Sequence, residues 1–537
     1  MHERLSAPKG ASASEKSLSV SRSPAWLRYA AIALLVAGIF FRFVNLGEKI
    51  YWLDEMHTSL RMSGHTEQEF IEEVTTGEVL RAGDLQQYQR PGSEKSWGDT
   101  MQALQGNPEH TPLYFLMARA WTELFGHSPA TIRSLSALIS ILVFPGLFWL
   151  CRELFQSSVV GWIAVALVAV SPLHVLYAQE ARPYSLWTLM IVLSSAVLLW
   201  AMRSQSRLRW ALYGLSVSVG LYSQLLFGLV AIAHGLYVAA VEWVGKWRFN
   251  RTIISYLVAA GAALVSFIPW LMVFFTRLDR VEDTTSSLRE TITVSTLINK
   301  SFLNMSRVLL DRELGGANFV MVLLAAVAVI YLCRKAPPRA WKFLLLLGGV
   351  SLLALLVPDL ILGGVRSIRL RYLFPFYLSI QIALAYLFAT QAVWARTWGQ
   401  KFWRLVMVIL ITGGVMAGVA NINNVLPWTK SAARSAYYPD VSAIVNQANQ
   451  AGNPLIISNG DMAEILAFSY WLDPDVNLQL ITRPRLLEIA PGYDPVYLLN
   501  PSAVLRRILT EQGYDLSLVY KEPEDMYKPK ERLWLVN

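Results

Sequence analysis

Apolar stretches about as long as a bilayer is thick follow one another from residue 24 to residue 420, separated by short polar connections. A helix needs roughly 20 apolar residues to cross the hydrocarbon core of a membrane. Stretches that approach this length lie at 24–44, 131–151, 158–177, 183–202, 209–225, 227–245, 252–275, 316–333, 342–361, 373–394 and 403–420. The pattern predicts an α-helical polytopic membrane protein with about eleven transmembrane helices. The composition excludes a large soluble enzyme, because 54% of the residues are hydrophobic and only 16% are charged, against about 25% charged in a typical soluble domain.

The placement of basic residues predicts the orientation in the membrane. Segment 111–125 is interrupted by Arg119 and Glu123 and would reach only about 22 Å as a helix, so we expect it to lie in the outer interface with Trp121 as an anchor. The basic connections then all share the cytoplasmic side with the N-terminus, as the positive-inside rule requires. This topology signal also explains the net charge of +9 without a nucleic-acid partner. The basic connections contain Arg203, Arg207, Arg209, Lys246, Arg248, Arg251, Arg334, Lys335, Arg339, Lys342, Arg396, Lys401 and Arg404.

The same pattern divides the chain into three parts. Residues 1–23 form a Ser-rich basic leader that we expect to be disordered and cytoplasmic, and 24–421 form the transmembrane domain, with a first extracytoplasmic loop at 46–130. Residues 422–537 are too polar for lipid and change to short alternating elements, which predicts a small extracytoplasmic α/β domain. We expect helices at 440–450 and 461–471, and strands at 454–458, 517–520 and 533–536. The predicted location is the plasma (inner) membrane, with many passes.

Three polar clusters lie on the outer face in this topology. Ionisable groups at membrane depth are candidates for function, although each cluster alone has a simpler explanation: a solvated loop start, a boundary salt bridge, or contact with lipid headgroups. Arginines outside run against the positive-inside tendency and point to an anion, because the guanidinium fork binds phosphate with paired, charge-assisted hydrogen bonds. The clusters are Asp54, Glu55 and His57; Glu180, Arg182 and Tyr184; and Arg366, Arg369, Arg371 and Tyr372.

Together these clusters fit transfer of a group from an anionic lipid carrier. A lipid phosphate is a good leaving group, so such a reaction needs cations that stabilise the departing phosphate rather than a strong general acid. It also needs a carboxylate that accepts the proton of the incoming hydroxyl. The sequence supplies both kinds of group on one side of the membrane.

At these residues the sequence resembles the GT-C membrane glycosyltransferases of the protein O-mannosyltransferase and aminoarabinose transferase type (glycosyltransferase family 39-like). The resemblance is strongest over residues 25–225, and the rest agrees in layout. Two departures leave the acceptor open: Thr111 stands where the family's His-Pro-Pro has its first proline, and the Lys-Pro of the aminoarabinose transferases is missing. The matching pieces are Leu53-Asp54-Glu55, His110-Thr111-Pro112-Leu113-Tyr114, Leu124-Phe125-Gly126, Arg133-Ser134-Leu135-Ser136-Ala137, the run from Tyr177 to Tyr184, and Arg371-Tyr372-Leu373-Phe374-Pro375.

The resemblance implies a GT-C-type bundle and an inverting transfer from a polyprenyl- or dolichyl-phosphate sugar, in which Asp54 is the catalytic base with Glu55 beside it. Arg371 would meet the carrier phosphate, and the acceptor would be a hydroxyl of a protein, glycan or lipid. We expect no required cofactor and no metal ligands. Substrate-binding residues implied in this way are His110, Glu180, Arg182, Tyr184, Arg366, Arg369, Arg371 and Tyr372.

Several alternatives remain open. A divalent metal is possible at Asp54, Glu55, His57, Glu109 and His110, although their spacing matches no ligand signature. A flippase of lipid-linked sugars would explain the many spans and the outer arginines, but it predicts repeated halves, and the chain shows no internal repeat. A non-catalytic assembly factor, or an O-antigen ligase or polymerase, is a further possibility. For two more histidines, at 174 and 234, we expect packing roles.

Overall fold

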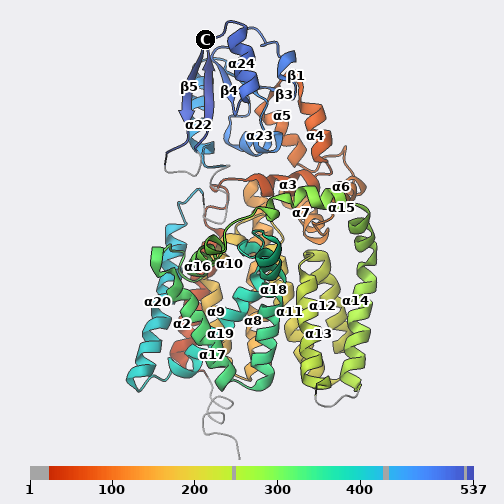
Figure 1. Ribbon diagram of the computed structural model, residues 1–537, viewed down its shortest axis with the longest axis vertical. Coiled ribbons are helices and arrows are strands. Elements are labelled where there is room, and N and C mark those ends of the chain that lie inside the picture. Colours follow the sequence, from red (N-terminus) through yellow and green to blue (C-terminus); the bar gives the residue numbers. More distant parts are fainter. Residues whose placement is uncertain (1–22, 245–248, 427–434, 525–528) are drawn as a thin grey trace, which may run out of the picture.

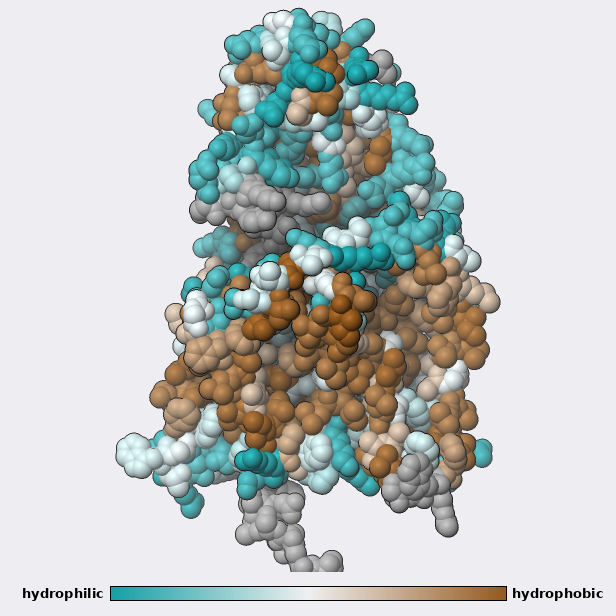
Figure 2. Space-filling model, in the orientation of Figure 1, coloured by the Kyte–Doolittle hydropathy of each residue, from teal (hydrophilic) through white to brown (hydrophobic). Residues whose placement is uncertain are grey.

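A bundle of long helices carries a mixed α/β domain at one end, with a layer of short helices between the two (Figure 1). The computed structural model describes residues 23–244, 249–426, 435–524 and 529–537. The predicted leader therefore lies, except for its last residue, outside the described residues. On the face shown in Figure 2, hydrophobic side chains form a band across the bundle, whereas mostly hydrophilic side chains lie on the α/β domain and at the opposite end. This surface is that of a multi-span membrane protein.

The long helices of the bundle occupy the segments predicted to cross the membrane. Within the described residues, seven helices are long and apolar enough to cross a bilayer, or up to eight if one bent pair counts as a span. The predicted number of eleven is therefore not established by length and composition. The bundle contains α2 (Ala25–Phe43), α8 (Pro129–Phe155), α9 (Ser158–Ala169), α10 (Pro172–Ala178), α11 (Tyr184–Ser204), α12 (Arg207–Ser223), α13 (Phe227–Val238), α14 (Arg251–Thr276), α17 (Phe319–Lys335), α18 (Pro338–Leu362), α19 (Phe374–Gln391) and α20 (Trp398–Ala420).

The segment predicted as one span at 158–177 is broken. Its helices α9 and α10 meet at an angle of 58°. The break falls at Ser171, which precedes Pro172 and is extended, as residues before proline tend to be. The buried guanidinium of Arg42 donates to the carbonyls of Ala169 at 2.6 Å and Val168 at 3.2 Å. Arg42 thus adds side-chain donors to carbonyls in the last turn of α9, where the end of a helix leaves carbonyls without their usual partner four residues later.

The α/β domain contains a six-stranded sheet in the order β1-β3-β2-β4-β6-β5, counted over the described residues. Strand β2 pairs in parallel with β3 and β4, while β6 pairs antiparallel with β4 and β5. The edge strand β1 belongs to the first loop after α2 and pairs antiparallel with β3. The strands are β1 (Thr76–Arg81), β2 (Leu455–Ser458), β3 (Asn477–Ile481), β4 (Val496–Leu499), β5 (Leu516–Lys521) and β6 (Glu531–Val536), and the helices α22 (Tyr438–Ala451), α23 (Met462–Phe468) and α24 (Ala503–Glu511).

The short elements form the layer that connects the bundle to the α/β domain. Gln86 and Gln89 donate to the backbone carbonyls of Ser469 and Leu466, each at 3.2 Å, so the first loop holds the domain in place. The predicted anchor Trp121 instead donates its indole N–H to Thr131, at 3.0 Å. The layer contains α3 (Leu53–Met62), α6 (Trp97–Gln105), α7 (Leu113–Phe125), α15 (Leu278–Thr284), η1 (Gln86–Gln89), η3 (Ser286–Arg289) and η5 (Leu370–Tyr372). Helices α4 (Glu67–Val74) and α5 (Ala82–Leu85) lie beside β1, whereas α16 (Val294–Leu310) and η4 (Gly315–Asn318) pack against helices of the bundle. Helix η2 (Ala239–Trp243) ends α13, and η6 (Ser469–Trp471) and η7 (Pro484–Leu486) belong to the α/β domain.

Candidate active site

Helix α3, at the end of the bundle beneath the α/β domain (Figure 1), carries Asp54, Glu55 and Arg61 of the candidate site. Residues spaced by three or four positions share one face of a helix, so Asp54, Thr58 and Arg61 lie on the same side of α3. Glu55 follows Asp54 directly and is rotated from it by about 100°. Two carboxylates that are adjacent in sequence therefore face different surroundings.

Asp54 is held by two arginines from distant parts of the chain. Its carboxylate forms an ion pair with Arg371, and 21% of its side chain is exposed. Its backbone carbonyl accepts a hydrogen bond from Arg182 at 3.0 Å. Burial alone would raise the pKa of Asp54, but the charges of Arg371 and Arg182 outweigh this and lower the pKa to about 2. Asp54 is thus an ionised acceptor that remains open to solvent.

Glu55 is enclosed and fully paired. Arg133, which is equally buried, donates to its two oxygens at 2.7 and 2.8 Å. The backbone N–H of Ala181 adds a third bond at 2.8 Å. Both side chains have no exposed surface. The geometry gives Glu55 a positioning role: it fixes α3 to α8 and to the turn between α10 and α11.

Arg133 extends the same network, and the sequence analysis assigned it no role. Its guanidinium also donates to the backbone carbonyls of Leu46, Lys49 and Ile50 at 2.6 to 3.0 Å. The connection from α2 into α3 is therefore tied to α8. The sequence could have indicated this residue, because Arg133 lies near the start of an apolar helix. An arginine that is buried there needs a carboxylate partner.

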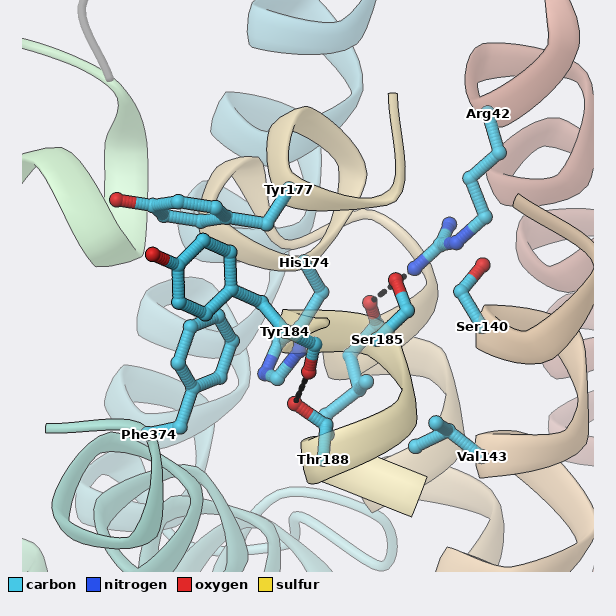
Figure 3. A pocket seen from close by; sticks show the side chains of 10 residues that line it. Arg42, Ser140, Val143, His174, Tyr177, Tyr184, Ser185, Thr188 and Phe374 are labelled. Atoms are coloured by element: carbon cyan, nitrogen blue, oxygen red, sulfur yellow. Dashed lines mark hydrogen bonds between the residues drawn. The ribbon is translucent and has the colours of Figure 1, made fainter. Parts of the chain in front are cut away.

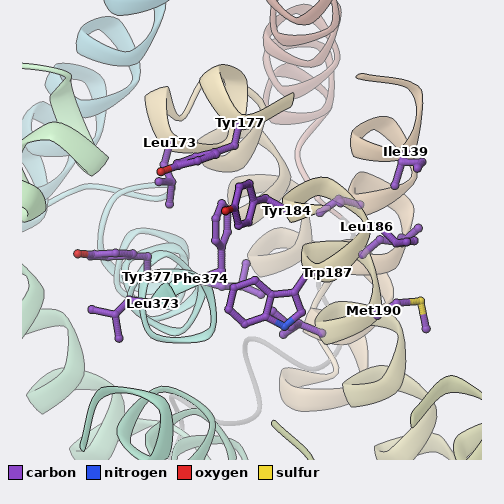
Figure 4. Close-up of a cluster of buried hydrophobic side chains, with 14 of the residues drawn as sticks. Ile139, Leu173, Tyr177, Tyr184, Leu186, Trp187, Met190, Leu373, Phe374 and Tyr377 are labelled. Atoms are coloured by element: carbon purple, nitrogen blue, oxygen red, sulfur yellow. The ribbon is translucent and has the colours of Figure 1, made fainter. Parts of the chain in front are cut away.

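The second predicted cluster lies beside the first. Arg182 donates to Thr58 at 3.2 Å, and its guanidinium lies 6.0 Å from the ring centroid of Tyr184. The Tyr184 ring stacks on Phe374 with centroids 6.1 Å apart (Figure 4). Glu180 is buried, with 1% exposed, and its contact with substrate stays a prediction.

The third predicted cluster is divided by the structure. Only Arg371 reaches Asp54, and its guanidinium lies 5.6 Å from the Tyr372 ring centroid. Arg366 forms an ion pair with Asp359 on α18 at 2.9 Å. Arg369 is exposed. Of the three arginines predicted to form a basic patch, only Arg371 therefore lies at Asp54, whereas Arg366 is paired with Asp359 and Arg369 faces solvent.

A third guanidinium and a histidine complete the site. Burial lowers the pKa of Arg61 to about 10, which keeps it protonated at neutral pH. Burial, followed by the charges of Arg61 and Arg182, lowers the pKa of His110 well below its usual value. His110 is therefore a neutral group in a positive field. Arg61 was not among the predicted residues, although its place seven positions after Asp54 could have indicated it.

Several buried polar atoms of this cluster have no hydrogen-bond partner within the described part of the chain. They are Nη1 of Arg61, Nε of Arg182 and Oε2 of Glu109. Because buried polar atoms in folded proteins are nearly always hydrogen-bonded, these atoms mark a place for a polar ligand. The charges of Arg61, Arg182 and Arg371 all act on His110 here, so the surroundings of His110 are positive.

The remaining candidates are a metal centre and the two histidines at positions 174 and 234. No group of three or more His, Cys, Asp or Glu side chains that could hold a metal ion occurs in the described ranges. His174 and His234 are buried, as expected of packing residues. Each has a hydrogen-bond partner within the bundle: Gln381 for His174 at 2.9 Å and Ser195 for His234 at 3.1 Å. His174 lines a cavity of about 10 Å³ between Arg42 and the aromatic residues (Figure 3), which has room for about one water molecule.

Comparison with known proteins supports the class of fold. Residues 109–273 match the family of dolichyl-phosphate-mannose-protein mannosyltransferases. The structure of ArnT from Cupriavidus metallidurans bound to undecaprenyl phosphate is similar over 96% of this chain and 98% of that one, with 12% identity and a TM-score of 0.53. The same protein in the apo state gives 12% identity over 95% and 97%, with a TM-score of 0.47. The oligosaccharyltransferase AglB from Archaeoglobus fulgidus gives 11% identity over 84% and 64%, with a TM-score of 0.45.

The family match and the similarity to the ArnT structure bound to undecaprenyl phosphate confirm the resemblance recognised in the sequence. The chain has the GT-C membrane fold, and within it residues 109–273 carry the sequence pattern of a GT-C glycosyltransferase family. No curated protein sequence matches the chain significantly. The matched segment includes Glu109, His110 and Arg182 of the site, while Asp54 and Arg371 lie outside it.

Proposed function

We propose that the protein is an inverting glycosyltransferase that moves a sugar from a polyprenyl-phosphate donor to an acceptor hydroxyl. The observation that carries the proposal is the convergence of Arg61, Arg182 and Arg371 around the ionised, partly exposed Asp54. A positive cluster with unpartnered N–H groups suits a lipid-linked phosphate. The undecaprenyl phosphate bound to the similar ArnT structure supports this class of donor.

Asp54 and Arg371 have complementary roles in the proposed reaction. The acceptor oxygen attacks the anomeric carbon as its proton passes to the Asp54 carboxylate, and the bond between that carbon and the phosphate oxygen breaks. Both electrons of the broken bond leave with the phosphate, whose charge the guanidinium of Arg371 stabilises. Attack from the face opposite the phosphate inverts the configuration at the anomeric carbon.

Donor binding and the basicity of Asp54 are linked in this geometry. A phosphate that binds Arg371 weakens the ion pair between Arg371 and Asp54. The effect of burial is then opposed less strongly, so the pKa of Asp54 rises from about 2, which makes the carboxylate a better proton acceptor. Asp54 therefore becomes more basic when the donor binds.

We further propose that the site faces the extracytoplasmic side of a bacterial plasma membrane. Lys246 and Arg248 lie outside the described residues, and the other basic connections lie at the end of the bundle opposite the α/β domain (Figure 1). This placement supports a cytoplasmic N-terminus and an extracytoplasmic C-terminal domain. The α/β domain and the first loop then cover the site and are suited to select the acceptor. The reaction as written requires no cofactor.

A direct test measures sugar release from a panel of radiolabelled polyprenyl-phosphate sugars by the protein in membranes. We expect turnover with at least one donor and a loss of roughly 10²- to 10⁴-fold in the Asp54→Asn variant, the range for a positioned general base. Asp283→Asn, a change of the same kind at an exposed position on α15, is the matched control and should turn over normally. Normal turnover of Asp54→Asn would show that Asp54 is not the base, and transport of labelled lipid across liposomes without sugar release would favour a flippase.

A further inference from the structure

A deep groove runs between α12 and α14, away from the candidate active site. The two helices lie side by side at the edge of the bundle (Figure 1). The groove has a volume of about 810 Å³, within the range of ligand sites of roughly 300–1,000 Å³. Its lining includes the apolar side chains of Leu215, Ile254 and Val258 and the buried small residues Gly214 and Ala259.

Both arginines of the groove lie at its end farthest from the α/β domain. Arg207 and Arg251 begin α12 and α14, and both line the groove. Each is exposed, and neither guanidinium forms an ion pair within the described residues. Two adjacent cations at the mouth of an apolar groove complement an amphiphile with an anionic head.

Two buried polar atoms lie at the same mouth. Only 5% of Trp210 is exposed, and its indole N–H has no hydrogen-bond partner within the described part of the chain. Gln205 donates through Nε2 to Thr252 at 2.6 Å, while its Oε1 has no partner in the same residues. A donor and an acceptor without partners beside two arginines match a headgroup that carries both a phosphate and a hydroxyl.

The length of the groove fits one leaflet of a bilayer. The lining residues extend from Arg207 to Ser218 on α12, which corresponds to about 16 Å of helix, close to half of the roughly 30 Å hydrocarbon core. A hydrogen bond of 2.7 Å between Ser218 and Ser266 joins the helices at the inner end of the groove. None of the active-site residues lines the groove, so an occupant is separate from the donor.

We propose that this groove is a binding site for an anionic phospholipid of the leaflet opposite the α/β domain. Its phosphate lies between Arg207 and Arg251 and accepts the indole N–H of Trp210. A headgroup hydroxyl donates to Gln205, and an acyl chain follows Leu215 and the facing residues of α14. A lipid bound in this way holds α12 against α14 from the outside.

The test uses the full-length protein, stripped of lipid in detergent and offered equal amounts of phosphatidylglycerol and phosphatidylcholine. Native mass spectrometry then counts the bound lipids. We expect preference for phosphatidylglycerol in the wild type and about 30-fold weaker binding in Arg207→Gln/Arg251→Gln, because each arginine near a membrane surface contributes about a factor of five. Trp210→Phe, which removes only the N–H donor, should weaken binding by several-fold.

The matched control is Arg334→Gln/Arg339→Gln, which removes the same charge from the last turn of α17 and the first turn of α18. This variant should bind phosphatidylglycerol as the wild type does. Equal binding of the two phospholipids by the wild type would overturn the proposal, as would unchanged binding in the Arg207 and Arg251 variant. Displacement of phosphatidylglycerol by a polyprenyl phosphate in the wild type would also overturn it, since the groove would then belong to the donor.

Discussion

The substitution Glu55→Gln separates a positioning role of this carboxylate from a direct role in catalysis. Glu55 accepts two hydrogen bonds from Arg133 and one from the N–H of Ala181, all between 2.7 and 2.8 Å. Glutamine retains one carbonyl oxygen but places an amide N–H₂ against a guanidinium N–H, and it removes the charge that compensates Arg133. The side chains of the pair are completely buried, so water cannot replace the lost acceptor.

The expected cost follows from this geometry. Removal of one partner from a buried ion pair destabilises a protein by about 3–5 kcal/mol, because the remaining charge stays buried without compensation. Arg133→Met should cost more than Glu55→Gln, since the backbone carbonyls of Leu46, Lys49 and Ile50 also lose their donor. Asp54→Asn should cost at most about 1 kcal/mol, because the ion pair between Asp54 and Arg371 is partly exposed.

The assay compares the fraction of monodisperse protein after heating in detergent with the rate of sugar release at low temperature. Glu55→Gln should lower the temperature of half-loss and retain measurable turnover in the surviving folded fraction. Asp54→Asn should show the reverse, with wild-type thermal behaviour and little turnover. Wild-type stability of Glu55→Gln together with abolished turnover would refute the positioning role and place Glu55 in the chemical step.

Two further predictions concern the ion pair at Asp54 and the packing of α2. In Arg371→Gln the pKa of Asp54 rises, because one of the two guanidiniums that oppose the effect of burial is removed. As pH falls, residual turnover should therefore be lost at a higher pH than in the wild type. Identical acidic limits of turnover in the two proteins would contradict this. A Cβ on Gly38 would lie 2.3 Å from the carbonyl oxygen of Ala169, so Gly38→Ala should destabilise the protein by about 1–3 kcal/mol in the heating assay. Gly261→Ala, where no atom lies within 4 Å, is the control and should be neutral.

The membrane class of the protein could be predicted from the sequence because lipid imposes a one-dimensional requirement. A spanning helix must be apolar over a fixed length, and this property is visible in the chain without any knowledge of tertiary contacts. The broken span at Ser171 was not predicted, although Pro172 was visible. Whether a proline bends or ends a helix depends on what satisfies the freed carbonyls, and here the donor is Arg42 from another helix.

In the α/β domain, too, some elements could be predicted from the sequence and others depend on tertiary contacts. The alternating pattern predicted strands β2, β5 and β6, but it did not predict β1, which comes from the first loop and pairs with β3 some 400 positions later in the chain. Strand β1 is a short, largely exposed edge strand, so its sequence carries little hydrophobic alternation. Its identity as a strand depends on the hydrogen-bonding edge that β3 presents.

In the candidate site, the sequence by itself determined which residue types were present on the outer face, but only the tertiary structure decided their roles. Asp54 and Glu55 are neighbours with the same chemistry, and their different roles follow from the helical rotation that points one to Arg371 and the other to Arg133. The same holds for the arginines near residue 370, where Asp359 binds Arg366 and leaves Arg371 to meet Asp54. A residue's type fixes its charge and hydrogen-bonding groups, whereas its pKa, exposure and partners arise from contacts between segments that are distant in the sequence.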